Sequence, residues 1–163
     1  DSDSPACTED ASCDPPKPPR EDLVPAIETA TADWESRGPS DYTYVYANLC
    51  FCFVDHVRPV RVVVKSGVVT AALFPDGTAA PSERHLTMRD QLERAHAWAT
   101  EEPHRLSFES DPELGYLLSA DVDPALFIAD DEEKIDVSRF AASTGDDACP
   151  LSEIDDPTAR LSP

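Results

Sequence analysis

The stretch that decides the fold is Asp41-Tyr42-Thr43-Tyr44-Val45-Tyr46-Ala47-Asn48-Leu49-Cys50-Phe51-Cys52-Phe53. Successive side chains of a β-strand point to opposite faces, so the alternation sorts this stretch into two rows. One row holds the tyrosines, Asn48 and the two cysteines. The other row begins at Thr43 and ends at Phe53. Because both rows are largely apolar or aromatic, the pattern predicts a central strand over 41–53 that is covered on both faces.

The row formed by Tyr42, Tyr44 and Tyr46 has two interpretations. Tyrosine combines an apolar ring with a polar tip, so the row is predicted to pack under a helix with its hydroxyls at the edge of that helix. The alternative is a stacking or recognition surface.

Helical periodicity precedes this strand. Leu23, Ile27, Ala30 and Trp34 recur at helical spacing and form one apolar stripe. Pro25 is tolerated only in a first turn, because proline lacks the backbone donor that later turns require. Glycine followed by proline in Arg37-Gly38-Pro39 predicts the end of the helix.

The elements that follow predict the fold class. Two strands at 60–65 and 68–74 are separated only by Ser66-Gly67, which predicts a tight hairpin. Thr87 and Asp90 have capping-box spacing at the start of a second helix, whose apolar stripe is Met88, Leu92, Ala95 and Ala99. Further strands are expected at Leu106 and Phe108, at Leu118, Ala120 and Val122, and at Ile135, Val137 and Phe140. This order predicts an α+β fold with an antiparallel meandering sheet of five to six strands and two helices packed on one face.

The 163 residues divide into one domain and two extensions. Residues 1–20 form a Pro-rich, Cys-containing N-terminal extension, and prolines there favour extended linker geometry. Residues 21–140 are expected to form a single α+β domain, and residues 141–163 an acidic C-terminal extension.

The charge excludes some partners. The chain has 33 acidic and 13 basic residues, a net charge of −20. That charge repels phosphate backbones and anionic membrane surfaces, so no nucleic-acid partner is expected. No apolar run has the length of a transmembrane segment. Acidity on this scale suits solubility in a salty medium, a divalent cation site or a basic partner.

Cysteine usage indicates an oxidising compartment. The five candidates for structural disulfides are Cys7, Cys13, Cys50, Cys52 and Cys149. Cys7 and Cys13 could close a small loop in the extension, while Cys50 and Cys52 could be bridged to each other, to Cys149 or to the tail. The polar start at Asp1 resembles that of a mature export product.

Two other roles exist for Cys50 and Cys52, which share one strand face. With His56 they form a Cys-x-Cys-x3-His set that could bind a soft metal. A redox-active pair is the other alternative, because Arg58 and Arg61 are near in sequence and a neighbouring cation lowers a thiol pKa.

An acidic segment is the second candidate metal site. Oxygen ligands of the kind calcium prefers occur at Asp121, Asp123, Asp130, Asp131 and Glu132. The segment lacks EF-hand spacing and its central glycine, so ordinary surface acid is the competing interpretation.

Catalytic motifs are absent from the sequence. It contains no Gly-x-Ser-x-Gly, no His-Glu-x-x-His and no glycine-rich phosphate loop. We therefore expect a non-enzymatic protein without a cofactor other than calcium, which binds a partner protein or packs into a larger assembly.

A family resemblance supports this expectation. The run from Trp34 through Cys50-Phe51-Cys52 to Pro59-Val60-Arg61-Val62 and Gly67, followed by Leu114-Gly115-Tyr116 and Asp121-x-Asp123-Pro124, resembles domain-of-unknown-function family 6174 over about residues 30–140. The resemblance implies an exported bacterial envelope or extracellular protein, often lipid-anchored upstream of such a domain, with no established activity.

Overall fold

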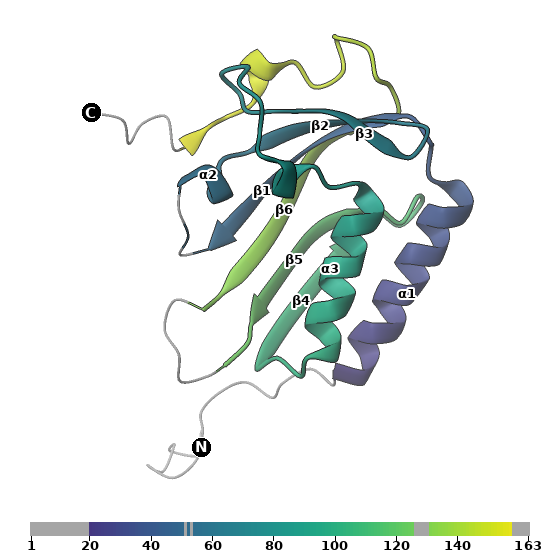
Figure 1. Ribbon diagram of the computed structural model, residues 1–163. Helices are drawn as coiled ribbons and strands as arrows, with labels where there is room; N and C mark the ends of the chain where they lie inside the picture. The colour runs from purple at the N-terminus through teal and green to yellow at the C-terminus, as the bar shows by residue number, and fades with distance from the viewer. Residues whose placement is uncertain (1–19, 51, 53, 126–130, 158–163) are drawn as a thin grey trace, which may run out of the picture.

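The computed structural model describes residues 20–157, apart from residues 51, 53 and 126–130. Its elements in chain order are α1 (Arg20–Arg37), β1 (Tyr42–Cys50), α2 (Val54–Val57), β2 (Val60–Lys65), β3 (Val68–Leu73), η1 (Ser82–Arg84), α3 (Met88–Thr100), β4 (Arg105–Ser110), β5 (Leu117–Asp123), β6 (Glu133–Ala141) and η2 (Leu151–Glu153). The six strands form one antiparallel sheet in the order β3-β2-β1-β6-β5-β4. Helices α1 and α3 lie side by side on one face of it (Figure 1). The predicted α+β class with two helices on one face is confirmed.

The topology repeats itself in the two halves of the chain. Each half contributes a long helix followed by a three-stranded meander, and the halves join where β1 pairs with β6. That pairing brings residues 42–50 beside residues 133–141 at the centre of the sheet (Figure 1). The repeat is one of topology, and the sequence carries no matching internal repeat.

Helix α1 buries the predicted stripe, with Ile27, Ala30 and Trp34 in the core. The helix begins earlier than predicted, so the exposed Pro25 lies beyond its first turn. Only glycine fits at the end of the helix, because a Cβ on Gly38 would lie 2.5 Å from the Trp34 carbonyl oxygen. Gly115 is equally constrained, with φ of +81° and a Cβ position 2.2 Å from the Ala30 carbonyl oxygen. The β4–β5 turn can therefore lie directly against α1.

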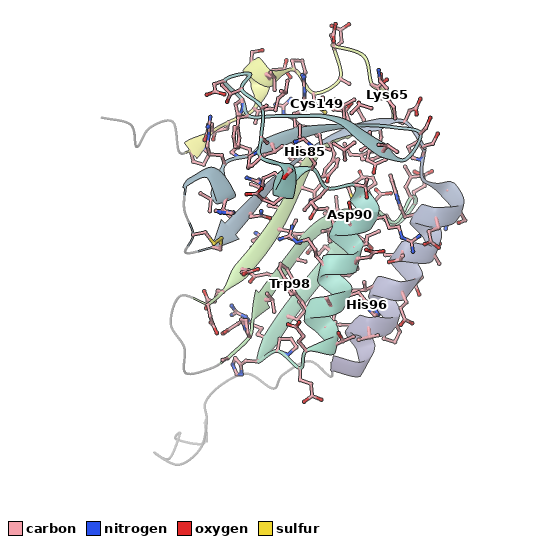
Figure 2. All side chains as sticks on the ribbon, in the orientation of Figure 1. Lys65, His85, Asp90, His96, Trp98 and Cys149 are labelled. Carbon is pink, nitrogen blue, oxygen red and sulfur yellow. A yellow bond between two sulfur atoms is a disulfide. The ribbon has the colours of Figure 1, made fainter. Side chains whose placement is uncertain are left out.

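Helix α3 starts with the predicted capping box. The Thr87 hydroxyl accepts from the Asp90 backbone N–H, and the Asp90 carboxylate accepts from the Thr87 backbone N–H at 2.8 Å. Asp90 lies at the N-terminal end of the helix (Figure 2). All four residues of the predicted stripe are buried, and so is Gln91, which the apolar pattern did not include.

The tyrosine row packs under α3 and its leading turn, as predicted. Tyr44 and Tyr46 are 0% exposed and Tyr42 is 3% exposed. The Tyr42 hydroxyl accepts from the Met88 backbone N–H at 2.8 Å. The hydroxyls of Tyr44 and Tyr46 donate to the backbone carbonyls of Leu86 and Arg84 at 2.5 and 2.8 Å, respectively. Three consecutive side chains of one strand face thus bind a single segment, residues 84–88.

Two details of the predicted strands are wrong. Strand β1 ends at Cys50, and Cys52 lies in a bend outside the strand, while residues 51 and 53 lie outside the described residues. Leu117 is buried in place of Leu118, because β5 has an extra residue opposite Glu109 and Ser110. Phe140 packs against the core with Ile135 and Val137, as predicted, and it does so through an irregularity in the β1–β6 pairing, where Arg139 has φ of +50°. Bulges shift the alternation by one residue, and a simple period of two does not reveal them.

Removing one hydroxyl of the tyrosine row tests these contacts. We expect Tyr44→Phe to lower the free energy of unfolding by about 1–3 kcal/mol, because Leu86 loses its donor and Gln91 loses its acceptor in the core. Tyr116→Phe, at the partly exposed fourth tyrosine, should cost about 0.5 kcal/mol or less. Denaturant unfolding followed by circular dichroism measures both values. Equal effects for the two variants would contradict the assigned role of the row.

Candidate functional site

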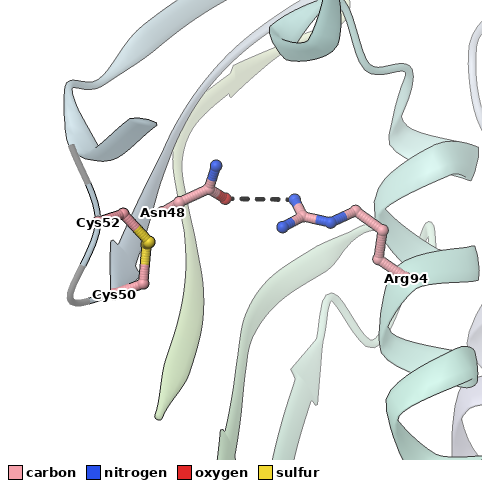
Figure 3. Close-up of a disulfide and its surroundings, with 4 residues drawn as sticks. All are labelled: Asn48, Cys50, Cys52 and Arg94. Carbon is pink, nitrogen blue, oxygen red and sulfur yellow. Dashed lines mark hydrogen bonds between the residues drawn. A yellow bond between two sulfur atoms is a disulfide. The ribbon is translucent and has the colours of Figure 1, made fainter. Parts of the chain in front are cut away.

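The helix-facing row of β1 continues past the tyrosines into a polar network. Arg94 on α3 donates from Nη1 to Asn48 Oδ1 at 3.2 Å and to Gln91 Oε1 at 2.8 Å. Gln91 in turn donates from Nε2 to the Tyr44 hydroxyl at 3.2 Å. Figure 3 shows Arg94 reaching from α3 toward Asn48, two residues before Cys50. The network therefore connects the core to the end of β1.

The Arg94 guanidinium is a fixed positive charge at this end of the strand. Burial is the main cause that lowers its pKa, and the neighbouring Tyr46 and Glu133 oppose that shift. An arginine nevertheless stays protonated in a protein. The guanidinium carbon also lies 5.7 Å from the centre of the Trp98 ring, a favourable cation–π position.

A disulfide joins Cys50 and Cys52, with their Cα atoms 5.2 Å apart (Figure 3). Cys52 is exposed and Cys50 is half-buried. The pair opens onto a cavity of about 150 Å³. Its other lining residues are Asn48, Leu49, His56, Arg94, Glu133 and Lys134. The lining thus combines the two cysteines with three nitrogen-bearing side chains and one carboxylate, and we call this the disulfide pocket.

This disulfide contributes little to the stability of the fold. The loop-closure relation gives about 1.6 kcal/mol for a loop as short as Cys50-Phe51-Cys52. The core of the domain is built from residues on α1, α3 and all the strands, and none of its buried members is a cysteine of this pair.

The cations of the disulfide pocket are not those nearest in sequence. Arg58 binds Asp76 at 3.2 Å and Asp156 at 3.4 Å, and it stacks over the Phe74 ring. Arg61 pairs across the sheet with Val45 and does not line the pocket. The structure places Arg94 and Lys134 there instead. Sequence reasoning missed both, because α3 and β6 reach Cys50 only through the tertiary fold.

The remaining cysteines lie elsewhere. Cys149 is a buried free thiol beside the Arg139 backbone carbonyl (Figure 2), and burial raises its pKa. Cys7 and Cys13 lie outside the described residues. Of the pairings considered for Cys50 and Cys52, the structure has the one that bridges them to each other.

The predicted metal ligands are only partly described. Asp121 and Asp123 lie on β5, where their cross-strand neighbours are Lys134 and Arg105. Asp131 and Glu132 directly precede β6, and Asp130 lies outside the described residues. Among the residues that the structure describes, no three His, Cys, Asp or Glu side chains are placed to hold a metal ion. Calcium binding at this segment, and soft-metal binding at the reduced Cys50, Cys52 and His56, stay predictions.

The opposite face of β1 carries an apolar groove of about 320 Å³. Its floor is Val45, Ala47 and Leu49, and it lies on the face of the sheet that α1 and α3 leave uncovered (Figure 1). The walls and rim are Val57, Pro59, Asp136, Ser138, Arg139, Glu153, Ile154, Asp155 and Pro157. Leu49 is 47% exposed on the floor of this open-face groove.

The C-terminal segment after β6 forms one side of this groove. It is held against the sheet by a hydrogen bond from the Thr43 hydroxyl to the Ser143 carbonyl at 2.7 Å. Arg139 binds Glu153 at 2.7 Å, and Arg58 reaches Asp156. The segment covers Thr43 and Val45, which are 1% and 3% exposed, but it leaves Leu49 open. The predicted complete cover of both strand faces is therefore wrong at the end of β1. The sequence predicts only two long helices, both on one face of the sheet, and this signal could have indicated that the second face is partly open.

A third hollow, of about 490 Å³, lies between α1 and α3. Its floor includes Leu92 and Ala97, and its rim carries acids from both helices. Arg89 binds Glu35 and Glu93 there, and His96 lies 3.4 Å from Glu28. The charged side chains at the rim therefore largely pair with one another, and we interpret this hollow as the ordinary gap between two packed helices.

Comparison with known proteins places the fold in a family. Residues 26–142 match a family of unknown function, DUF6174. The chain belongs to DUF6174. The match extends from within α1 to just past β6, so this domain includes the disulfide pocket and the floor of the open-face groove. No curated protein and no solved structure matches the chain. Within the described ranges, no helix has the length and apolar character needed to cross a membrane.

Proposed function

We propose that this DUF6174 protein is a non-catalytic, exported bacterial envelope or extracellular module that binds a partner protein through the open-face groove. The observation that carries the proposal is the half-exposed Leu49 on an apolar floor, between walls formed by α2 and the C-terminal segment. A large apolar side chain left open in a walled depression is typical of an interaction site.

The charge around the groove defines the partner. Asp136, Glu153 and Asp155 line it. Among the described residues, Arg139 is the one basic residue of the lining, and it already binds Glu153. The whole chain carries a net charge of −20. An extended partner segment with apolar side chains flanked by lysine or arginine would complement both the floor and the rim.

The exported location is part of the same proposal. A disulfide persists in an oxidising compartment and is rare in the cytosol, so the Cys50–Cys52 bridge favours secretion or the periplasm. The family resemblance implies the same compartment, and a lipid anchor upstream of residue 1 would place the module at the envelope surface.

Peptide selection tests the groove. We expect a random peptide library selected on the immobilised protein to yield peptides rich in apolar and basic residues. These should bind Leu49→Lys at least tenfold more weakly than the unchanged protein, because the new charge removes the apolar floor and repels basic peptides. Val68→Lys is the matched control, because Val68 on β3 is 63% exposed. This substitution adds the same charge outside the groove. Thermal melts establish that both variants are folded.

Two results would contradict the groove proposal. One is a set of selected peptides that bind Leu49→Lys and the unchanged protein equally well. The other is a selection that enriches no apolar-basic peptides at all.

Calcium binding is the second candidate function, and one observation favours it. Asp123 Oδ1 and Asp131 Oδ1 are both buried and have no hydrogen-bond partner among the residues that the structure describes, and in sequence they flank residues 124–130. A buried carboxylate oxygen without a donor is costly, and a bound cation would relieve that cost.

Calcium-dependent melting distinguishes this candidate from the first. Free calcium at ten times the dissociation constant should stabilise the protein by about 1.4 kcal/mol relative to a chelator, and so raise the melting temperature by several degrees. Asp146→Asn, at an exposed acid, should keep this shift and Asp123→Asn should lose it. A melting temperature that millimolar calcium leaves unchanged would eliminate the calcium site and leave the groove proposal untouched.

A further inference from the structure

We propose that Cys50–Cys52 is a thiol–disulfide exchange centre whose substrate is a dithiol of a peptide or protein. The exchange reaction itself does not use the open-face groove, although Leu49 lines both that groove and the disulfide pocket. The argument rests on access to the sulfurs, on the charges around them and on the small structural role of the bridge.

Access to the two sulfur atoms is unequal. Cys52 is exposed, whereas Cys50 is half-buried at the end of β1 beside Asn48 (Figure 3). An incoming thiolate therefore reaches the Cys52 sulfur first, and the Cys50 sulfur is the leaving group. In thiol–disulfide exchange the attacking thiolate approaches one sulfur in line with the disulfide bond. The reaction is faster when the thiolate that leaves is stabilised.

The charges of the disulfide pocket favour thiolates. Two cations line it, Arg94 from α3 and Lys134 from β6, together with the imidazole of His56 and the single carboxylate of Glu133. Glu133 lies opposite Cys50 across the β1–β6 pair and Lys134 lies opposite Leu49, so the neighbours on β6 contribute charges of both signs. The guanidinium of Arg94 is held by hydrogen bonds to Asn48 and Gln91, neither of which is a cysteine of the pair. This arrangement stands out in a chain of net charge −20, because cations beside a cysteine are what makes its thiolate accessible.

The bridge can open without loss of the fold. It closes a loop of minimal length, so its removal returns little conformational freedom to the unfolded chain. The buried core contains neither cysteine of the pair. A purely structural disulfide would be expected to join distant segments.

The proposed reaction moves two electrons and balances without a further group. One substrate thiolate forms a bond to the Cys52 sulfur while the Cys50–Cys52 bond breaks, and Cys50 leaves as a thiolate and takes up a proton. The second substrate thiolate then attacks the substrate sulfur of this mixed disulfide and releases Cys52 as a thiolate, which is protonated in turn. The substrate is oxidised to a disulfide and the pair is reduced to two thiols. Repeated turnover needs a disulfide oxidant such as oxidised glutathione.

Reduction of the full-length native protein tests the proposal. Dithiothreitol, an uncharged dithiol, is the substrate, and alkylation with peptide mapping follows the Cys50–Cys52 peptide separately from the other cysteines. We expect the pair to be reduced while circular dichroism stays unchanged. Arg94→Gln should slow this reduction at least fivefold. Arg89→Gln, on the same helix but bound to Glu35 and Glu93, should stay within twofold of the unchanged protein.

Arg94→Gln could slow reduction simply by disturbing the fold, so a second variant and a second measurement are included. Lys134→Gln removes a half-buried charge at the rim of the disulfide pocket and should slow reduction at least threefold. The pH dependence of iodoacetamide alkylation of the reduced pair should place one thiol pKa below the ordinary cysteine value, and Arg94→Gln should raise it. With oxidised glutathione present, the protein should accelerate oxidation of a dithiol peptide, and the variant with Cys50→Ser and Cys52→Ser should not.

Three results would overturn the proposal. The first is a pair that dithiothreitol reduces only when the domain unfolds. The second is the same reduction rate in Arg94→Gln, Lys134→Gln and Arg89→Gln. The third is a dithiol peptide whose oxidation the protein does not accelerate.

Discussion

The hydrogen bonds between the tyrosine row of β1 and the backbone of residues 84–88 are the constraint on which the rest of the structure depends. Each hydroxyl is buried, so each bond is worth about 1 kcal/mol when made and costs more when a partner is left unpaired. A shift of the 84–88 segment by one residue would break all three bonds together. They therefore fix where α3 starts on the sheet, and the starting point of α3 decides where Gln91 and Arg94 reach β1.

Strand β1 thus serves two surfaces by simple alternation. Its helix-facing row begins with the aromatic core and ends in the disulfide pocket, where Asn48 and Arg94 connect the two. Its opposite row begins under the C-terminal segment and ends in the open-face groove at Leu49. The two proposed activities lie on adjacent residues, Leu49 and Cys50, but face opposite sides of the sheet. Leu49 lines the disulfide pocket as well as the groove, so a substitution there can affect both activities, whereas Arg94 lines the disulfide pocket and not the groove.

Local patterns predicted the elements of this fold well. The capping box at Thr87, the apolar stripes and the glycine after α1 are short-range signals, and the structure has each of them. The strand order was not predictable, because the β1–β6 pairing joins segments about ninety residues apart and no local signal encodes it. For the same reason the cations beside Cys50 were assigned to Arg58 and Arg61, which are near in sequence, and not to Arg94 and Lys134. The open-face groove was missed because apolar alternation alone does not reveal whether a face is covered.

The measurement that tests the role of the tyrosine row most directly is an alkaline titration of the native protein, with phenolate absorbance and circular dichroism recorded together. Burial raises the pKa of Tyr42 to about 12 and raises those of Tyr44 and Tyr46. The unfolded chain releases these protons near pH 10, so the stability that they contribute is complete below pH 10 and is lost as the pH rises toward the folded-state values. The pKa of Tyr116 is also raised, mainly by burial, but its side chain is only partly buried. We predict that Tyr116 ionises without structural change, and that the other three ionise only as the circular dichroism signal collapses. Ionisation of all four tyrosines near pH 10 in a folded protein would contradict the account.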